Sequence, residues 1–461
     1  MIPRLKPRVI NFRPKDIHTS KLLALNSIPL HLPHTIRSLR RLKNLSMKKI
    51  LFLLLTGFAA TAQILSPIQK SHPQMDDKRL AYIDTVMEEY IQKNWMVGST
   101  TLVIKDNSVV YFKSNGYADL ANKKPMTNEA IYRIMSQTKA ITSVAIMQLF
   151  EQGKLHLDQA VGDFIPEFAT QNVVKDFNPA DSSYTTEPAK RKITIRDLLS
   201  HRSGIDYAAI GSPKMQVIYA KAGIPSGLGN FNAVLLDKMK SLGRLPLAHQ
   251  PGEKFTYGLN TDLLGCLVEV ITGKTLEDYF KANIFEPLGM KDSYFTVPLE
   301  KSSRMPKVYT ENADKQIIPW DPTFRNLDPN YPLYPHTYFS GGAGLSMSTF
   351  DYATFLQMLL NGGVYNGKQI LGRRTIELMT SPQINMGNDD FGLGFSLTSK
   401  KSAQLNVVSE GTFAWGGYYG TSYFVDPKEK LVVLIMTQHT PNSHGNYGRK
   451  IENIIYGSLK K

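Results

Sequence analysis

The sequence predicts a mixed α/β (α+β) sandwich, in which helices flank one antiparallel sheet and a helical lobe is added. A helix and two strands begin the body of the chain, a mainly helical region fills about 155–335, and strands and a helix end the chain. Because a sheet buries its apolar face against another layer, we expect both chain ends to build one sheet. The helical region is then an insertion, and the active site is expected where the two lobes meet.

The first elements are an amphipathic helix and a hairpin. Apolar residues recur at helical spacing over 79–94. Two strand-like runs follow at 99–104 and 109–112, joined by the short polar segment 105–108. This pattern is typical of a β-hairpin.

The rest of the chain is also expected to form helices and a hairpin. A helix apolar on most sides is expected over 136–154, which indicates burial, and Gly153 fits its end. Further expectations are a helix over 349–360, a hairpin of 421–425 with 431–436, and a last helix over about 445–458. We assign 63–461 to one catalytic domain, with a sheet lobe of about 75–135 and 340–461 and a helical lobe of about 136–339.

The formal net charge of +15 is concentrated near the start of the chain. Residues 1–46 hold ten Lys or Arg and one acid, and Lys48 and Lys49 add two more positive charges. The chain from Gln63 onward carries only about +4. This nearly balanced body argues against nucleic acid as a partner.

The segment 47–62 is typical of a secretory signal peptide. Met47-Lys48-Lys49 precedes the apolar run 50–55, and Ala60-Thr61-Ala62 precedes Gln63. The run is too short to span a bilayer, which needs about 20 residues. We expect cleavage before Gln63 and a periplasmic or secreted product, with 1–46 an over-extended start. The alternative is a basic disordered tail before a membrane anchor.

Cys266 is the only cysteine, so an intrachain disulfide is excluded. It lies in an apolar stretch and is expected to be a buried small hydrophobe. After the leader, no apolar run reaches membrane length.

The strongest chemical signal is Ser136-Gln137-Thr138-Lys139. Residues three apart share a helix face, so Lys139 is expected over Ser136, whose hydroxyl needs a base to become nucleophilic. Ser-x-x-Lys also begins at Ser46 and Ser458, but only Ser136 opens a buried helix. The alternative is that Ser136 simply caps the helix. A lysine at the third position opposes the helix dipole, whereas a capping box would place Glu or Gln there.

Two later segments add candidates. Tyr257 precedes a buried apolar helix and could relay protons beside the charge of Lys139, although packing is the usual role of a tyrosine. The Gly-rich segment 413–420 opens the C-terminal hairpin, and glycines in a strand often mark close approach by a ligand. A backbone N–H there could join that of Ser136 in an oxyanion hole. The alternative is a bulge with a core Trp.

In this order the three elements resemble the serine β-lactamases and penicillin-binding proteins. Further segments resemble the class C-like branch, with its carboxylesterases and D-aminopeptidases: 194–204 is similar to TIRDLLSHTSG, 287–293 to PLGM-x-D-T and 342–348 to GGGLxST. The resemblance spans roughly 80–455. His201, inside the first of these segments, is interpreted as structural.

Two departures bear on the substrate. The branch usually has Tyr-x-Asn, but here Asn260 stands one place late after Tyr257. The third element, usually Lys-Thr-Gly or His-x-Gly, is Trp415-Gly416-Gly417. In the family the cation there helps to bind a substrate carboxylate, which a tryptophan cannot do. Both changes resemble the esterase members, which carry Tyr-Ser-Leu and Trp-Gly-Gly.

The resemblance implies that Ser136 attacks an ester or amide carbonyl while Lys139 and Tyr257 move protons. The N–H groups of Ser136 and Tyr418 would hold the oxyanion. The expected substrate is a small-molecule ester, amide or β-lactam, and an acyl-enzyme released by water needs no metal or cofactor. Carboxylesterase-like activity is favoured over two alternatives, a β-lactamase or D-stereospecific peptidase and a catalytically silent cell-wall ligand-binding homologue. Residues expected to contact the substrate are Trp415, Gly416, Gly417 and Asn260.

Overall fold

The computed structural model describes residues 64–460, except 228–232 and 325–326. The described residues belong to one compact unit, Thr61–Lys461. The predicted leader 1–46, the predicted signal peptide 47–62 and Gln63 lie outside them.

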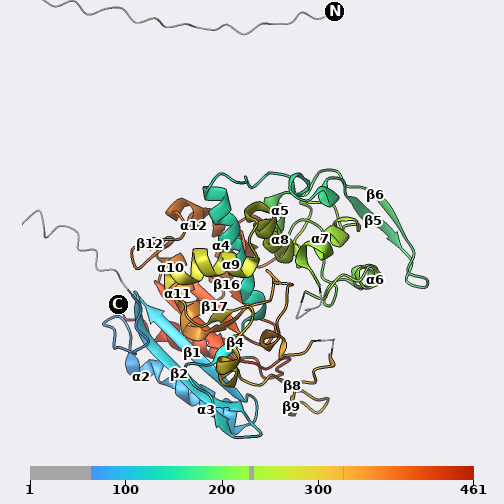
Figure 1. Cartoon of the computed structure of the whole chain (residues 1–461). Coiled ribbons are helices and arrows are strands. Elements are labelled where there is room, and N and C mark those ends of the chain that lie inside the picture. Colours follow the sequence, from blue (N-terminus) through green and yellow to red (C-terminus); the bar gives the residue numbers. More distant parts are fainter. Residues whose placement is uncertain (1–63, 228–232, 325–326, 461) are drawn as a thin grey trace, which may run out of the picture. The chain divides into compact units, whose positions relative to one another are not determined.

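A nine-stranded antiparallel sheet forms the centre of this unit (Figure 1). The early strand β1 pairs with the late strand β18, with Leu102 opposite Leu434, so both chain ends build one sheet as predicted. In sheet order the strands are β13 (Ile384–Asn385), β14 (Asp390–Phe391), β15 (Ser396–Leu397), β16 (Phe413–Gly416), β17 (Ser422–Asp426), β18 (Leu431–Met436), β1 (Gly98–Lys105), β2 (Ser108–Asp119) and β3 (Lys124–Pro125).

The predicted first hairpin is present, and its second strand is longer than expected. Asp106 and Asn107 adopt φ angles of 49° and 61° between β1 and β2. Two consecutive residues with positive φ match the right-handed twist of the strands, and Asp and Asn tolerate this conformation well. Strand β2 continues to Asp119 because it goes on pairing with β1 and then with β3.

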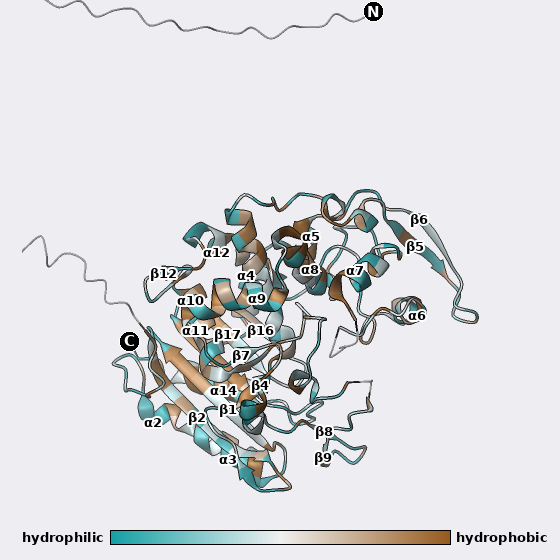
Figure 2. Ribbon diagram, viewed as in Figure 1, coloured by the Kyte–Doolittle hydropathy of each residue, from teal (hydrophilic) through white to brown (hydrophobic). Residues whose placement is uncertain are grey.

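Helices cover both faces of the sheet, because side chains of a strand alternate between faces. Val103 and Val433 face the helices α3 (Tyr82–Gln92) and α14 (Tyr447–Gly457). Leu102 and Leu434 belong to the larger core with α11 (Thr349–Leu360). Figure 2 shows the apolar residues on β1, whereas the short α2 (Asp77–Leu80) is mainly hydrophilic. The predicted helix 79–94 is thus divided into α2 and α3.

The predicted buried helix begins two residues later than expected. A 3₁₀ turn occupies Met135–Gln137, and α4 runs from Thr138 to Glu151. Nearly all of its residues are buried, and Gly153 follows with a φ of 68°. The helix therefore passes through the core between the sheet and the helical lobe.

The helical lobe contains α8 (Asn260–Thr272), which packs against α4 and holds the fully buried Cys266. Burial raises the pKa of the Cys266 thiol. A small sheet in the order β4 (Ile131–Arg133), β10 (Ser346–Ser348) and β7 (Ser293–Tyr294) stands beside the start of α4. Other elements are α5 (Ile195–Leu199), α6 (Pro213–Lys221), α7 (Leu235–Gly243), α9 (Leu276–Phe280), α10 (Glu286–Leu288), α12 (Arg373–Met379), α13 (Lys400–Ala403) and the hairpins β5–β6 (Asn172–Phe177, Tyr184–Pro188), β8–β9 (Tyr309–Glu311, Ile317–Pro319) and β11–β12 (Val364–Tyr365, Lys368–Gln369). Among the described residues, no helix has the length and hydropathy that crossing a membrane requires.

Candidate active site

Ser136 stands on the tight turn between β4 and α4. Met135, the residue before it, is not a glycine and yet has a φ of 49°. Such strained positions persist only where the surrounding packing enforces them, and they cluster at functional sites. Here Met135 is fully buried, and the N–H of Ile134 donates to the carbonyl of Leu345 at 3.1 Å. Ser136 itself stays partly accessible to solvent.

The structure excludes the helix-capping alternative for Ser136. The residue in the capping position of α4 is Gln137, whose side chain makes no capping hydrogen bond. The Ser136 hydroxyl is instead turned toward two other side chains, those of Lys139 and Tyr257.

Lys139 is 2% exposed and is held by three acceptors. Its Nζ lies 3.3 Å from Ser136 Oγ, 2.9 Å from the hydroxyl of Tyr207 and 2.8 Å from the carbonyl oxygen of Gly342. A lysine nitrogen makes at most three hydrogen bonds, so these contacts occupy all of its positions. The amine is thereby fixed within reach of the serine.

Tyr257 approaches Ser136 from the loop before α8. Its hydroxyl donates to Ser136 Oγ at 2.7 Å, and Lys139 Nζ lies 4.7 Å from the centre of its ring. The ring is packed between aromatic neighbours, with centroid distances of 5.2 Å to Tyr207 and 5.5 Å to Trp415. The packing fixes the hydroxyl at the serine, so the structure brings Ser136, Lys139 and Tyr257 together.

Tyr207 was not singled out from the sequence. It is 1% exposed, and burial, followed by the nearby Tyr257 and Asp262, raises its pKa well above that of a free tyrosine. Its phenol therefore stays neutral and can accept a hydrogen bond from the Lys139 ammonium. The available signal was its position three residues after Gly204, at the end of the segment 194–204.

The Gly-rich strand end lies directly against the nucleophile's turn. A Cβ atom on Gly417 would stand 2.3 Å from the carbonyl oxygen of Ile134, so only glycine fits there. This close approach brings the Gly417–Tyr418 peptide to the turn that carries Ser136. The oxyanion hole formed by the Ser136 and Tyr418 N–H groups stays a prediction.

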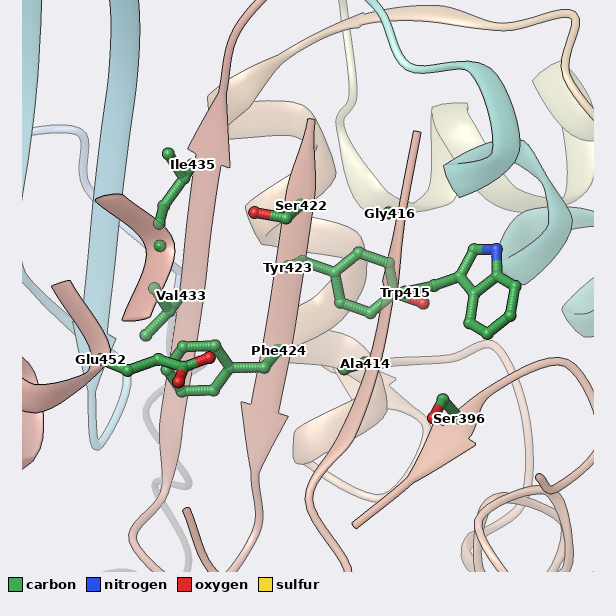
Figure 3. A pocket seen from close by; sticks show the side chains of 11 residues that line it. Ser396, Ala414, Trp415, Gly416, Ser422, Tyr423, Phe424, Val433, Ile435 and Glu452 are labelled. Carbon is green, nitrogen blue, oxygen red and sulfur yellow. The ribbon is translucent and has the colours of Figure 1, made fainter. Parts of the chain in front are cut away.

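Trp415 and Gly416 also line a cavity of about 350 Å³ that contains none of the three residues Ser136, Lys139 and Tyr257. Figure 3 shows this cavity over β16, β17 and β18, with Glu452 of α14 on one side and the Trp415 ring extending to the other. The Trp415 ring contacts Tyr257 and, at 5.3 Å, Phe391. The indole therefore belongs to the wall of the serine site.

Asn260 does not join this cluster. It is fully buried, and its amide lies 3.0 Å from Nδ1 of His201 and accepts a hydrogen bond from Ser203 at 2.5 Å. These contacts tie the start of α8 to the segment 194–204, so this placement does not support the predicted contact between Asn260 and substrate.

His201 has the surroundings of a structural residue. It is 2% exposed, and its ring packs against Tyr257, Phe255 and Phe391. Burial, followed by the charge of Lys139, lowers its pKa well below the usual value, so the ring is neutral near pH 7. It supports the position of Tyr257 at a centroid distance of 5.1 Å.

Comparison with known proteins agrees with this geometry. The family model described as Beta-lactamase matches residues 83–453. Esterase EstB of Burkholderia gladioli is 28% identical over 372 residues, which cover 77% of this chain and 90% of the esterase. A putative D-alanyl-D-alanine carboxypeptidase of Escherichia coli is 28% identical over 382 residues, covering 77% of this chain and 82% of the relative.

The fold is also similar to solved structures. One is EstCE1, described as a hydrolase with promiscuous acyltransferase activity. It is 28% identical, covers 83% of this chain and 99% of its own, and superposes with a TM-score of 0.72. The similarity therefore extends over nearly the whole described unit.

Proposed function

This chain belongs to the beta-lactamase family and is a serine hydrolase of the β-lactamase and penicillin-binding-protein superfamily; we propose that it is an exported carboxylesterase that works through a Ser136 acyl-enzyme. The observation that carries the proposal is the convergence on Ser136 Oγ of the Tyr257 hydroxyl at 2.7 Å and Lys139 Nζ at 3.3 Å. A nucleophile within hydrogen-bond reach of its base is the geometry that covalent catalysis requires.

The reaction begins when the neutral amine of Lys139 takes the Ser136 proton and Oγ forms a bond to the ester carbonyl carbon. The resulting oxyanion accepts hydrogen bonds from the N–H groups of Ser136 and Tyr418. When this intermediate collapses, the bond to the alcohol oxygen breaks, and that oxygen receives the proton that Lys139 took from Ser136, relayed through Tyr257, so that Lys139 returns to the neutral amine. Water then adds to the acyl-enzyme, releases the acid and restores the Ser136 hydroxyl.

The preference for esters rests on Trp415. Its indole stands beside Tyr257 at the place where the lactamase members of the family carry a cation. An aromatic face packs against uncharged acyl or alcohol groups and gives a carboxylate no ionic partner. The 28% identity to Esterase EstB supports this choice over the β-lactamase and D-peptidase alternatives.

Export rests on the tripartite segment 47–62, and the proposed compartment is the periplasm or the exterior of the cell.

The activity is tested by one hydrolysis panel on the purified protein. It contains short-chain p-nitrophenyl esters, a chromogenic cephalosporin and peptides ending in D-Ala-D-Ala. Ester hydrolysis well above the other two supports the proposal, whereas preferential release of D-Ala replaces it with a peptidase.

A further inference from the structure

A buried carboxylate, Asp262, stands behind the proposed base and has no role in the reaction described above. It is the third residue of α8 and is fully buried. It lies five positions after Tyr257 in the sequence, and its side chain contacts the loop 338–342. A carboxylate withdrawn from water is costly unless hydrogen bonds and an opposite charge compensate it.

The hydrogen bonds of Asp262 come from two hydroxyl groups and one backbone N–H. Oδ1 accepts from Ser340 Oγ at 2.6 Å and from the Tyr338 hydroxyl at 3.4 Å. The carboxylate also accepts a hydrogen bond from the backbone N–H of Gly342, which lowers its pKa. Oδ2 lies against Gly342, where an added Cβ would stand 2.5 Å from it.

Gly342 is also the residue that binds Lys139. Its carbonyl oxygen accepts from Lys139 Nζ at 2.8 Å. The carboxylate and the amine therefore contact the same residue from two sides, and glycine is required there because any side chain would collide with Oδ2. Both groups bind Gly342, and the charge of Lys139 acts on the Asp262 carboxyl, whose pKa it lowers.

The two groups influence each other electrostatically. Burial raises the pKa of Asp262, while the Ser340 hydroxyl and the charge of Lys139 lower it. In a poorly hydrated interior such an interaction is several times stronger than in water. A charge on Asp262 must in turn favour the ammonium form of Lys139.

On this geometry we propose that Asp262 is a positioning residue that acts as the buried counter-charge of Lys139 and sets the pH at which the amine can take the Ser136 proton. The inference rests on the proposed function, because it takes Lys139 as the base. Asp262 does not touch the substrate and acts only through Lys139.

The other titratable groups around this pair do not change charge near neutral pH. Burial raises the pKa values of Tyr207 and Tyr338 well above the usual value, and burial also raises that of Cys266, one helical turn beyond Asp262. His201 is already neutral, because burial and the Lys139 charge lower its pKa. Tyr257, whose hydroxyl bonds Ser136, is the remaining group that faces Lys139, and it is present in every variant compared below.

The test is the rate at which a fluorophosphonate labels Ser136 in the purified protein, measured from about pH 5 to 10. This rate reports activation of the serine and needs no knowledge of the substrate. The variant is Asp262→Asn, which removes the charge and keeps the shape. Asp262→Ser is measured as well, because it also removes the charge and takes less space if the amide does not fit. The matched control is Asp351→Asn, which neutralises another buried carboxylate, bound to Asp292 N and Ser293 Oγ on a different element.

Without the Asp262 charge a positive charge on Lys139 is less favourable, so the acidic limb of the profile is expected to move to lower pH. The control is expected to keep the wild-type limb. An unmoved limb in a folded Asp262 variant, whatever the overall rate, would overturn the inference and leave Asp262 a structural residue. Labelling that persists in Ser136→Ala would instead defeat the proposed function, and the two failures are therefore distinguishable.

Discussion

The Tyr257 hydroxyl donates to Ser136 Oγ at 2.7 Å across a separation of 121 residues. This contact joins the helical lobe to the turn that follows β4. Ser136, Tyr257 and Trp415 are partly accessible, whereas Lys139, Tyr207 and Asp262 are buried behind them. The site therefore has an outer layer that can meet a substrate and an inner layer that controls protons.

The first prediction concerns the proton relay. Tyr257→Phe keeps the ring packing against Tyr207 and Trp415 but removes the hydroxyl at Ser136. We expect kcat to fall by about 10²–10⁴-fold, the usual contribution of a general acid or base, with little change in KM. The matched control is Tyr219→Phe, a buried tyrosine whose hydroxyl accepts from Asp206 N and does not contact Lys139. A Tyr257→Phe enzyme with wild-type kcat would remove Tyr257 from the mechanism.

The second prediction concerns substrate choice. A carboxylate that loses a charged partner in a partly desolvated site forfeits about 1.5–3 kcal/mol, or roughly ten- to a hundredfold in affinity. Trp415→Lys is therefore expected to shift the ratio of kcat/KM values from a p-nitrophenyl ester toward a cephalosporin. Steady-state kinetics of both proteins on both substrates measure this ratio. A wild-type enzyme that prefers the cephalosporin would contradict the ester preference and leave Ser136 as the nucleophile.

The third prediction uses the pH dependence of stability. Burial raises the pKa of Asp351 to about 6, compared with 3.8 for the free residue. The folded state thus holds this proton more tightly than the unfolded chain, so the stabilisation by the proton is complete below pH 4 and is lost as the pH rises through about 6. Asp351→Asn carries no such charge. Its free energy of unfolding relative to wild type should rise by up to about 3 kcal/mol between pH 4 and pH 7, measured by urea denaturation. A constant offset between the two proteins would disprove this assignment.

The fourth prediction concerns processing. If 47–62 is a signal peptide, the exported protein begins at Gln63. Intact-mass or N-terminal sequencing of protein recovered from the periplasm or the medium checks this. Exported material that retains 1–46 would show the interpretation of the leader to be wrong.

The main elements of the fold could be predicted because their signals are local. Strand-like runs joined by short polar segments marked the hairpins, and the helical pattern marked α4 and α11 within two residues at each predicted start. The prediction that both chain ends share one sheet is confirmed, and the structure adds that β1 pairs with β18. Strands β13, β14 and β15 have two residues each, which is too short for any periodicity to register.

The residues of the candidate site likewise fall into those with a local sequence signal and those without one. Ser136 and Lys139 lie three residues apart, so a local motif was enough to join them. Tyr207 approaches Lys139 only through tertiary packing, and its position shortly after the segment 194–204 was the one local signal for it. Asn260 stands three positions after Tyr257, but α8 begins at Asn260 and directs its amide into the core. The short distance in sequence between Tyr257 and Asn260 therefore did not predict where the Asn260 side chain points.

The central claim is that Ser136 carries the acyl group. The direct test is peptide mass spectrometry of the protein after reaction with a fluorophosphonate, done on wild type and on Ser136→Ala. We expect the adduct on Ser136 in wild type, no adduct in the variant, and a loss of kcat on the order of 10⁶-fold with the fold retained. An adduct on another serine, or a folded Ser136→Ala enzyme that keeps more than a few per cent of wild-type activity, would contradict the account.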